Sequence, residues 1–289
     1  MVADVAGCEL VESFARLDEL LAGHRRRGSS VGFVPTLGGL HQGHAALIGA
    51  ARRSSDVVVV SVFLNPTQFE DPADLARYPH ELVADLALAA AAGADVVFAP
   101  SAEAMYPQGS PEVTVDPGAL GAVLEGAARP GHFRGVATVV AKLFALVRPS
   151  AAYFGEKDYQ QLVLVRQLVR DLCLPLAIVA CPTVRDPDGL AVSSRNALLD
   201  ADERRAATVL YRALRAGADA VRSGVADAGG IESVMRAVVA SEPAVSLDYA
   251  LPVADGRLER SEVVTGDVVL LIAARVGAVR LIDNLRVRR

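Results

Sequence analysis

The run VVVVSVFL at residues 57–64 is apolar at almost every position. A strand with one face in water alternates apolar and polar residues, whereas a strand covered by helices on both faces stays apolar throughout. The run therefore predicts a strand in the middle of a parallel sheet. Shorter apolar runs, each read as a strand, lie at residues 31–34, 95–99, 151–154 and 176–181.

Helical patterns separate these strands. They cover residues 43–53, 80–92, 135–147 and 159–171. The alternation of strands and helices predicts an α/β fold, a Rossmann-like doubly wound parallel sheet. Such a sheet binds its ligand at the carboxyl ends of its strands.

The pattern changes after about residue 183. Two helical stretches and three strand-like runs follow, at residues 200–223, 230–240, 245–251, 267–274 and 278–285. Helices followed by strands predict a smaller C-terminal α+β domain. Two prolines and a glycine in CPTVRDPDG, residues 181–189, mark the junction. We therefore expect domains at residues 1–183 and 184–289.

Composition excludes several classes of protein. The 289 residues are 52% hydrophobic and 22% charged, which argues against disorder. A net charge of −5, no Trp and 5% aromatic residues make a nucleic-acid partner a poor expectation. Cys8, Cys173 and Cys181 lack metal-like spacing and fit a reducing compartment. The Ala-rich residues 86–94 are too short for a membrane span. We expect a cytoplasmic protein that acts on small molecules, with no membrane partner.

The first cluster of chemically active residues follows the strand at residues 31–34 and opens the next helix. A helix start offers free backbone amides and the positive end of a dipole, which suits a phosphate. The cluster reads Pro35, Thr36, Leu37, Gly38, Gly39, Leu40, His41, Gln42, Gly43 and His44. A histidine at a helix start is also a common cap or surface residue, and two histidines alone make an incomplete zinc site. The strand, turn and helix favour phosphate binding.

Three further clusters are weaker when each is taken alone. In FLNPTQF, Asn65 and Gln68 offer neutral hydrogen bonds to a carboxylate or hydroxyl, although an ordinary Asn-Pro turn explains the motif better when it is taken alone. In FGEKDYQQ, Lys157 suits a phosphate and Asp158 a ribose, or Asp158 merely caps a solvated helix start. In AVSSRN, Arg195 suits a polyphosphate, or the segment caps the helix that follows.

Together the clusters resemble the pantothenate synthetases (pantoate–β-alanine ligases). The resemblance covers nearly the whole chain and is strongest in PTLGGLHQGH, FLNPTQF, RPGHFRGVATVVAKLF, FGEKDYQQ and AVSSRN. It implies that pantoate attacks the α-phosphate of ATP to give pantoyl adenylate, which β-alanine then converts to pantothenate with release of AMP. Mg²⁺ would accompany ATP, held mainly by phosphate oxygens and water. The resemblance also suggests a homodimer.

The resemblance implies a role for each matching residue. Residues 37–44 would cradle the phosphates, with His44 as proton donor. The catalytic set would be His41, His44, Lys157 and Arg195. Further ATP-binding residues would be Gly155, Glu156, Lys157, Asp158, Val184, Val192, Ser193, Ser194 and Arg195. Asn65, Gln68 and Gln161 would bind the substrates, with Gln161 on pantoate and Gln68 on both pantoate and β-alanine.

The chain departs from the family pattern at a few positions. Leu37, Gly39 and Val192 replace the usual Met, Ala and Met, and His80 replaces the usual Arg of a YPR string. Asp85, one turn after His80, is expected to be a solvated helix residue rather than a metal ligand. Two rival functions stay open, a different HxGH nucleotidyltransferase and an ATP-sensing module without catalysis. The retained His44, Lys157 and Arg195 argue against the second.

Overall fold

The chain forms two compact units in a computed structural model that describes residues 4–5, 7–70, 75–76, 78, 81–260 and 262–288. The first unit comprises Met1–Gly155 and Gln160–Cys181, and the second comprises Glu156–Tyr159 and Pro182–Arg289. The sequence placed one boundary between residues 183 and 184 and did not anticipate that Glu156–Tyr159 packs with the C-terminal part. His80 lies outside the described residues.

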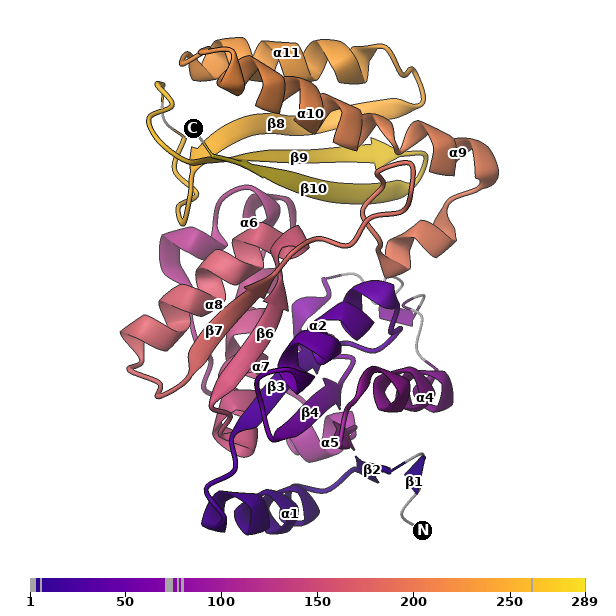
Figure 1. The fold of residues 1–289 in the computed structure, drawn as a ribbon, viewed down its shortest axis with the longest axis vertical. Helices are drawn as coiled ribbons and strands as arrows, with labels where there is room; N and C mark the ends of the chain where they lie inside the picture. The colour runs from indigo at the N-terminus through magenta and orange to yellow at the C-terminus, as the bar shows by residue number, and fades with distance from the viewer. Residues whose placement is uncertain are drawn as a thin grey trace. The chain divides into compact units, whose positions relative to one another are not determined.

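A seven-stranded sheet forms the centre of the first unit (Figure 1). Its order is β1-β2-β5-β4-β3-β6-β7, with β1 antiparallel to β2 and every other pair parallel. The strands are β1 (Asp4–Val5), β2 (Cys8–Val11), β3 (Val31–Thr36), β4 (Val57–Val62), β5 (Val96–Phe98), β6 (Ala151–Gly155) and β7 (Ala177–Cys181). The predicted Rossmann-like doubly wound parallel sheet is confirmed.

Helices cover both faces of this sheet. The described helices that belong to this unit in whole or in large part are α1 (Phe14–Arg26), α2 (Gln42–Arg52), α4 (Leu82–Ala92), α5 (Ala102–Met105), α6 (Glu125–Ala128), α7 (His132–Val147) and α8 (Tyr159–Asp171), with the 3-10 turns η1 (Pro66–Gln68) and η2 (Gly118–Gly121). Side chains of α2 and α4 pack with Val58 and Val60 of β4. Side chains of α1, α7 and α8 pack with Val57 and Val59. Because alternate residues of a strand face opposite sides, β4 is apolar throughout.

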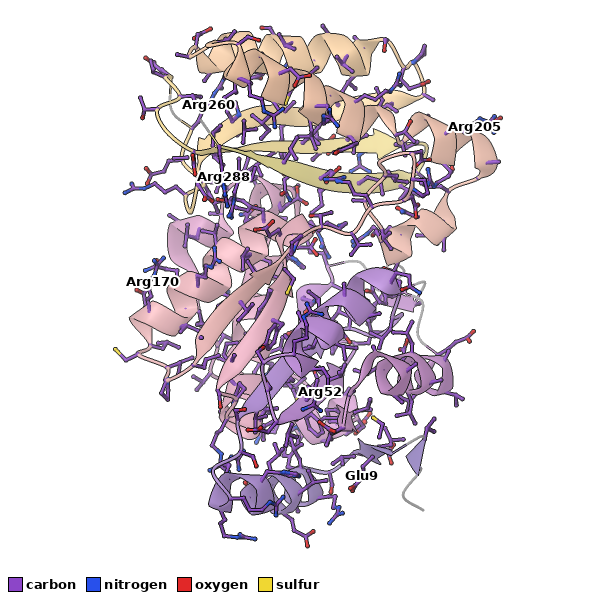
Figure 2. The ribbon with its side chains drawn as sticks, in the orientation of Figure 1. Glu9, Arg52, Arg170, Arg205, Arg260 and Arg288 are labelled. Carbon is purple, nitrogen blue, oxygen red and sulfur yellow. The ribbon has the colours of Figure 1, made fainter. Side chains whose placement is uncertain are left out.

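The amino ends of the strands are tied together by charge. Arg52, labelled in Figure 2, lies at the end of α2. It binds Asp95 at 2.7 Å and also donates to the backbone carbonyls of Ser55 and Asp56. The Asp95 carboxylate in turn accepts from the amide of Val58 at 2.7 Å. These bonds lie before β4 and β5, at the edge of the sheet opposite the predicted site.

The second unit is the expected smaller α+β domain, and this part of the prediction is confirmed. Its sheet is antiparallel with order β10-β9-β8. Its elements are η3 (Glu156–Asp158), η4 (Ser194–Leu198), α9 (Ala201–Ala206), α10 (Val209–Arg222), α11 (Ala228–Ala240), β8 (Val245–Ala254), β9 (Val268–Val276) and β10 (Val279–Val287). Apolar side chains of α10 and α11 pack on one face of the sheet and form the core.

Two details differ from the sequence prediction. The single helix expected at residues 200–223 is two helices, since α9 ends at Ala206 and α10 begins at Val209. Between them the hydroxyl of Thr208 donates to the carbonyl of Arg205 at 2.7 Å. The N-terminal strand β2 and helix α1 were not expected. Four residues are too few to show a periodic pattern, and β2 becomes a strand by pairing with β5. None of the described helices is both long enough and apolar enough to cross a membrane.

Candidate functional site

The strand order of the first unit reverses between β3 and β6. Strands β4 and β5 lie on one side of β3, and β6 and β7 lie on the other. In a doubly wound sheet, ligands bind at the carboxyl ends of the strands beside such a switch point. Residues 37–44 follow β3 and Gly155 ends β6, so two of the predicted site segments begin at this place.

The backbone turns sharply as it leaves β3. The hydroxyl of Thr36 donates to the carbonyl of Ser61 at 2.6 Å and accepts from the amide of Gly38 at 3.2 Å. Gly38 and Gly39 have φ values of 97° and 64°. Side chains other than glycine rarely adopt this left-handed region. Gly39, where the family commonly has Ala, thus suits the turn better than Ala does.

The side chain of Asp85, on α4, binds the backbone of this turn. Its two carboxylate oxygens accept from the amides of Gly39 at 3.0 Å and Leu40 at 2.7 Å. The side chain is 3% exposed, so the expectation of a solvated helix residue is wrong. The face of α4 that carries Asp85 also carries the buried Leu86 and Ala89. Two of the amides expected to cradle phosphates are therefore already used by a carboxylate.

His41 and His44 are held by the backbone at the start of α2. Nδ1 of His41 accepts from the amide of Gly43 at 3.1 Å, and Nδ1 of His44 accepts from the amide of His41 at 3.2 Å. The two rings stack with centroids 4.1 Å apart. An imidazole that accepts at Nδ1 carries its proton on Nε2. Both rings thus present an Nε2–H donor at a helix start.

Gly43 makes this arrangement possible. A Cβ atom at position 43 would lie 2.8 Å from Cε1 and 3.0 Å from Nδ1 of His41. Any larger residue would push the ring away from its place as helix cap. The spacing of the two histidines around a glycine therefore has a steric cause that the sequence alone did not reveal.

Asn65 is fully buried and all its polar atoms bind protein groups. Oδ1 accepts from the amide and hydroxyl of Thr67 at 3.4 and 2.9 Å, and from the hydroxyl of Tyr106 at 3.0 Å. Nδ2 donates to Oε1 of Gln68 at 3.0 Å and to the carbonyl of Gly135 at 3.3 Å. The Gln68 amide is thereby oriented with its Nε2 donors directed away from Asn65. Direct substrate binding by Asn65 stays a prediction.

The motif RPGHFRG, for which the sequence predicts no individual role, fixes the backbone of Gln68. The carbonyl of Gln68 accepts from Nδ1 of His132 at 2.9 Å and from Arg129 at 3.4 Å. A Cβ atom on Gly135 would lie 2.4 Å from the carbonyl oxygen of Thr67, so glycine is required where α7 meets η1. The order of the motif along the chain was visible in the sequence, but its contact with η1 was not.

Gln161 and Gln160 lie side by side in the chain and differ in environment. Gln161 is partly exposed in the first turn of α8. Gln160 is buried and its Nε2 donates to the carbonyls of Leu120 and Val123 at 2.9 and 2.8 Å. Gln161 thus keeps the accessibility that its predicted contact with a substrate requires, while Gln160 anchors the segment before α6.

In the second unit, Lys157 lies in η3, and its Nζ is 3.4 Å from Oδ1 of Asp158. Asn284 of β10 donates to the carbonyls of Glu156 and Lys157, each at 2.8 Å. The hydroxyl of Tyr159, which follows Asp158, donates to the carboxylate of Asp255 in the same unit at 3.0 Å. The segment with three of the residues predicted to bind the nucleotide, Glu156, Lys157 and Asp158, is therefore held by the C-terminal sheet.

The remaining predicted residues lie on a short hairpin and the turn after it. The amide of Val192 donates to the carbonyl of Val184 at 2.9 Å. Ser193 caps η4, its hydroxyl accepting from the amide of Arg195 at 3.3 Å. Val184 and residues 192–195 thus lie together in the second unit.

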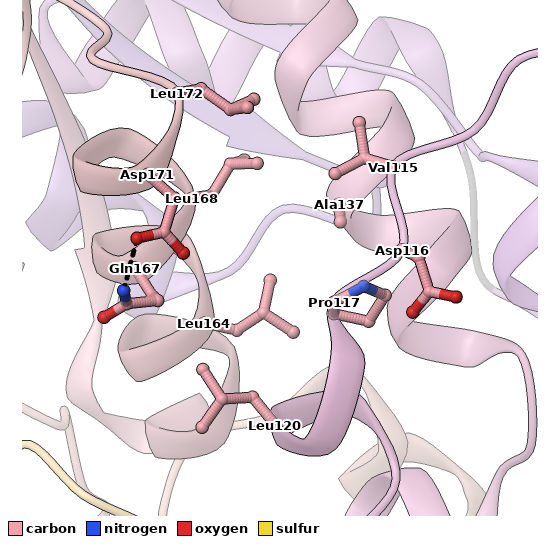
Figure 3. Close-up of a pocket in the computed structure, with 10 residues that line it drawn as sticks. All are labelled: Val115, Asp116, Pro117, Leu120, Ala137, Leu164, Gln167, Leu168, Asp171 and Leu172. Carbon is pink, nitrogen blue, oxygen red and sulfur yellow. Dashed lines mark hydrogen bonds between the residues drawn. The ribbon is translucent and has the colours of Figure 1, made fainter.

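The predicted site residues therefore fall into two groups, one in each unit. The first unit carries residues 35–44, Asn65, Gln68, Gly155 and Gln161. The second carries residues 156–158, 184 and 192–195. A separate cavity of about 110 Å³ in the first unit lies where α7 and α8 meet the segment at Val115–Leu120 (Figure 3). None of its ten lining residues is among the predicted site residues.

A family model described as pantoate-beta-alanine ligase matches residues 9–286 of the chain. The chain belongs to the pantoate–β-alanine ligase family. The family expected from the motifs is therefore confirmed.

Individual relatives agree with the family model. A pantothenate synthetase of Chloroflexus aurantiacus is 55% identical over 255 residues, covering 88% of this chain and 90% of the relative. The crystal structure of pantothenate synthetase from Thermus thermophilus superposes with a TM-score of 0.90 at 46% identity, covering 97% of this chain and 99% of the other. The pantoate-beta-alanine ligase of Francisella tularensis, complexed with beta-gamma ATP and β-alanine, has a TM-score of 0.79 at 34% identity, with 96% of each chain covered.

Proposed function

We propose that the protein catalyses the ATP-dependent condensation of pantoate with β-alanine. In the first half-reaction a carboxylate oxygen of pantoate attacks the α-phosphorus of ATP, and the bond to the pyrophosphate oxygen breaks. In the second, the β-alanine amine attacks the acyl carbon of the adenylate, loses a proton, and AMP leaves. The family membership of the chain and the ligands of the Francisella tularensis relative support this reaction.

The backbone-held pair His41 and His44 is the observation that carries the proposal. Adenylyl transfer requires positioning and stabilisation of negative charge rather than a covalent nucleophile. Two Nε2–H donors at the positive end of α2 suit the phosphate oxygens on which that charge develops. His44 is assigned to the leaving pyrophosphate, to which its Nε2 proton can be donated.

The glutamines are assigned to the substrates that do not contain phosphate. Gln68 and Gln161 bind the hydroxyl and carboxylate of pantoate without neutralising the nucleophile, and Gln68 also binds β-alanine. The inward-facing Asn65 supports Gln68 through the bond to its Oε1. The orientation of Gln68 leaves its Nε2–H groups as the donors for a substrate oxygen.

The second unit is assigned the remaining contacts to ATP. Lys157 and Arg195 bind phosphates, Asp158 binds the ribose, and Val184 meets the adenine through its backbone. Ser193, Ser194 and Val192 close on the phosphates as a C-terminal lid.

Mg²⁺ is assigned to the substrate, as MgATP. Among the described residues, no three His, Cys, Asp or Glu side chains form a group that could hold a metal ion. Asp85, whose carboxylate lies against the turn after β3, already accepts hydrogen bonds from two amides. Phosphate oxygens and water are the ligands that we assign to the metal. We also propose that the protein is a cytoplasmic homodimer. Analytical ultracentrifugation would measure its assembly state.

Exchange of labelled pyrophosphate into ATP tests the reaction. Exchange is expected with pantoate and without β-alanine, because the adenylate forms before the amine is used. AMP release on addition of β-alanine separates a ligase from a different nucleotidyltransferase and from an ATP sensor. Exchange that requires β-alanine contradicts the adenylate.

A second test concerns the phosphate contacts. His44→Ala and Lys157→Ala should each slow pyrophosphate exchange by about two to three powers of ten, the usual cost of one well-placed donor. Supplied pantoyl adenylate should still react with β-alanine in both variants. Normal pyrophosphate exchange in both variants would show that His44 and Lys157 do not bind the phosphates of ATP.

A further inference from the structure

Two adjacent polar side chains of β10, Asp283 and Asn284, are buried. They are 4% and 7% exposed. Burial of a charged or amide group is unfavourable unless its hydrogen-bonding atoms have partners. The partners of these two residues therefore indicate what the pair does in the second unit.

Asn284 binds the backbone that carries Lys157. Its Nδ2 donates to the carbonyl oxygens of Glu156 and Lys157, both at 2.8 Å. A side-chain amide has two N–H groups, so both are used. Two consecutive carbonyls held by one amide fix the peptide between Glu156 and Lys157, and with it the direction in which the Lys157 side chain leaves the backbone.

Asp283 binds the hairpin that carries Val184 and Val192. Its carboxylate accepts two hydrogen bonds from Arg185, at 2.6 and 2.9 Å. Arg185 also donates to the carbonyl of Asn284 at 3.0 Å. Arg185 pairs with Ala191 across the hairpin, so one fork-shaped ion pair fastens the whole hairpin to β10.

We infer that Asp283 and Asn284 are positioning residues that hold Lys157 and the 184–192 hairpin in fixed register for adenylate formation. Neither side chain contacts a substrate in this scheme. The inference rests on the proposed function, because that function gives Lys157 and the hairpin their contacts with ATP. Two segments distant in the sequence are thus set by neighbouring residues of one strand.

The Glu156–Tyr159 segment has other attachments to the second unit. Arg286 lies 3.4 Å from the carboxylate of Glu156. The hydroxyl of Tyr159 accepts from the amide of Gly256 at 2.6 Å and donates to Asp255 at 3.0 Å. Loss of the Asn284 amide should therefore leave the segment attached and alter mainly the peptide that precedes the Lys157 side chain.

Asn284→Ala tests the inference. Pantoate-dependent pyrophosphate exchange should lose about tenfold to a hundredfold in kcat/KM for ATP, as expected for two lost hydrogen bonds. The reaction of supplied pantoyl adenylate with β-alanine should keep its rate. If Asn284 acts through Lys157, the double variant Asn284→Ala with Lys157→Ala should be no slower than Lys157→Ala alone.

The matched control is Asp248→Asn. It removes an ion pair with Arg280 at 2.6 Å that also involves β10, and it should lower stability without changing kcat/KM for ATP. Thermal unfolding of each variant monitors folding, and Asn284→Ser, which keeps one donor, replaces Asn284→Ala if the latter does not fold.

Four outcomes overturn the inference. Normal exchange by Asn284→Ala together with impaired exchange by Lys157→Ala overturns the inference but not the proposed function. Additive effects in the double variant do the same. Failure of both Asn284 variants to fold assigns Asn284 to folding instead. Normal exchange by Lys157→Ala overturns the assigned role of Lys157 in the proposed function, and the inference falls with it.

Discussion

Asp85→Asn should disturb the turn after β3 and leave the rest of the fold intact. The carboxylate accepts from the amides of Gly39 and Leu40 and is 3% exposed. Asparagine keeps one acceptor and places an NH₂ donor against the other amide. A hydrogen bond to a charged group contributes about 1.5–3 kcal/mol, and a buried unsatisfied donor costs about 1–3 kcal/mol.

The turn should therefore lose about 3 kcal/mol of its stabilisation, which corresponds to about two powers of ten. Pantoate-dependent pyrophosphate exchange should lose about a hundredfold in kcat/KM for ATP, because His41 and His44 follow the turn directly. The reaction of supplied pantoyl adenylate should change much less. Titration calorimetry of ATP against the variant should show weaker binding.

Asp56→Asn is the matched control. Its carboxylate also accepts two hydrogen bonds, from the amide and hydroxyl of Ser30, each at 2.8 Å, and these lower the pKa of Asp56 below its ordinary value. Asp56 precedes β4, at the amino edge of the sheet, so its substitution should leave ATP kinetics unchanged. If Asp85→Asn exchanges pyrophosphate within threefold of the wild type, the turn does not depend on Asp85 and the reasoning is refuted.

Three further outcomes are expected. Gly43→Ala should displace the His41 ring, since its Cβ would lie 2.8 Å from Cε1. Pyrophosphate exchange should slow about tenfold or more, with little change in melting temperature. An unchanged rate would show that catalysis does not depend on the position of the His41 ring. Gln161→Ala should raise the KM for pantoate far more than that for ATP, while Gln68→Ala should impair the use of both pantoate and β-alanine. Loss of ATP binding in these variants would instead show that the two glutamines bind the nucleotide. Burial raises the pKa of Tyr159 from 10.0 to about 12, so its hydroxyl stabilises the fold below pH 10 and this contribution is lost as the pH rises to 12. In urea unfolding, the gap between wild type and Tyr159→Phe should close over that range, and a constant gap would show that the hydroxyl does not titrate there.

The central sheet was predictable because its signal is local. The apolar run of β4 and the helical period of α8, Tyr159–Asp171, are each contained in one stretch of sequence, and the bounds expected for α8 agree with the structure. Strand β2 depends on its partner β5. Features that depend on a partner elsewhere leave no periodic pattern.

The candidate site divides in the same way. Segments that follow a strand, such as residues 37–44, are found by their place in the strand order. Residues that support them are not, because their partners lie far along the chain. Asp85 looks like a solvated helix residue until the turn that it binds is known, and Asn284 lies 127 positions from Lys157, whose carbonyl it binds. Two-residue contacts of this kind are set by the tertiary fold.

The discontinuous second unit limits how the chain can be divided. Residues 156–159 belong to it, yet β6 and most of α8 on either side belong to the first unit. A fragment ending at Cys181 would keep Glu156 and Tyr159 but lack Asn284, Asp255 and Arg286, which bind them. A chimera that joins two homologues near residue 182 would likewise mix donors and acceptors from different parents. A chimera that takes its C-terminal part from one homologue should therefore also take residues 156–159 from that homologue, because the two segments form one structural unit.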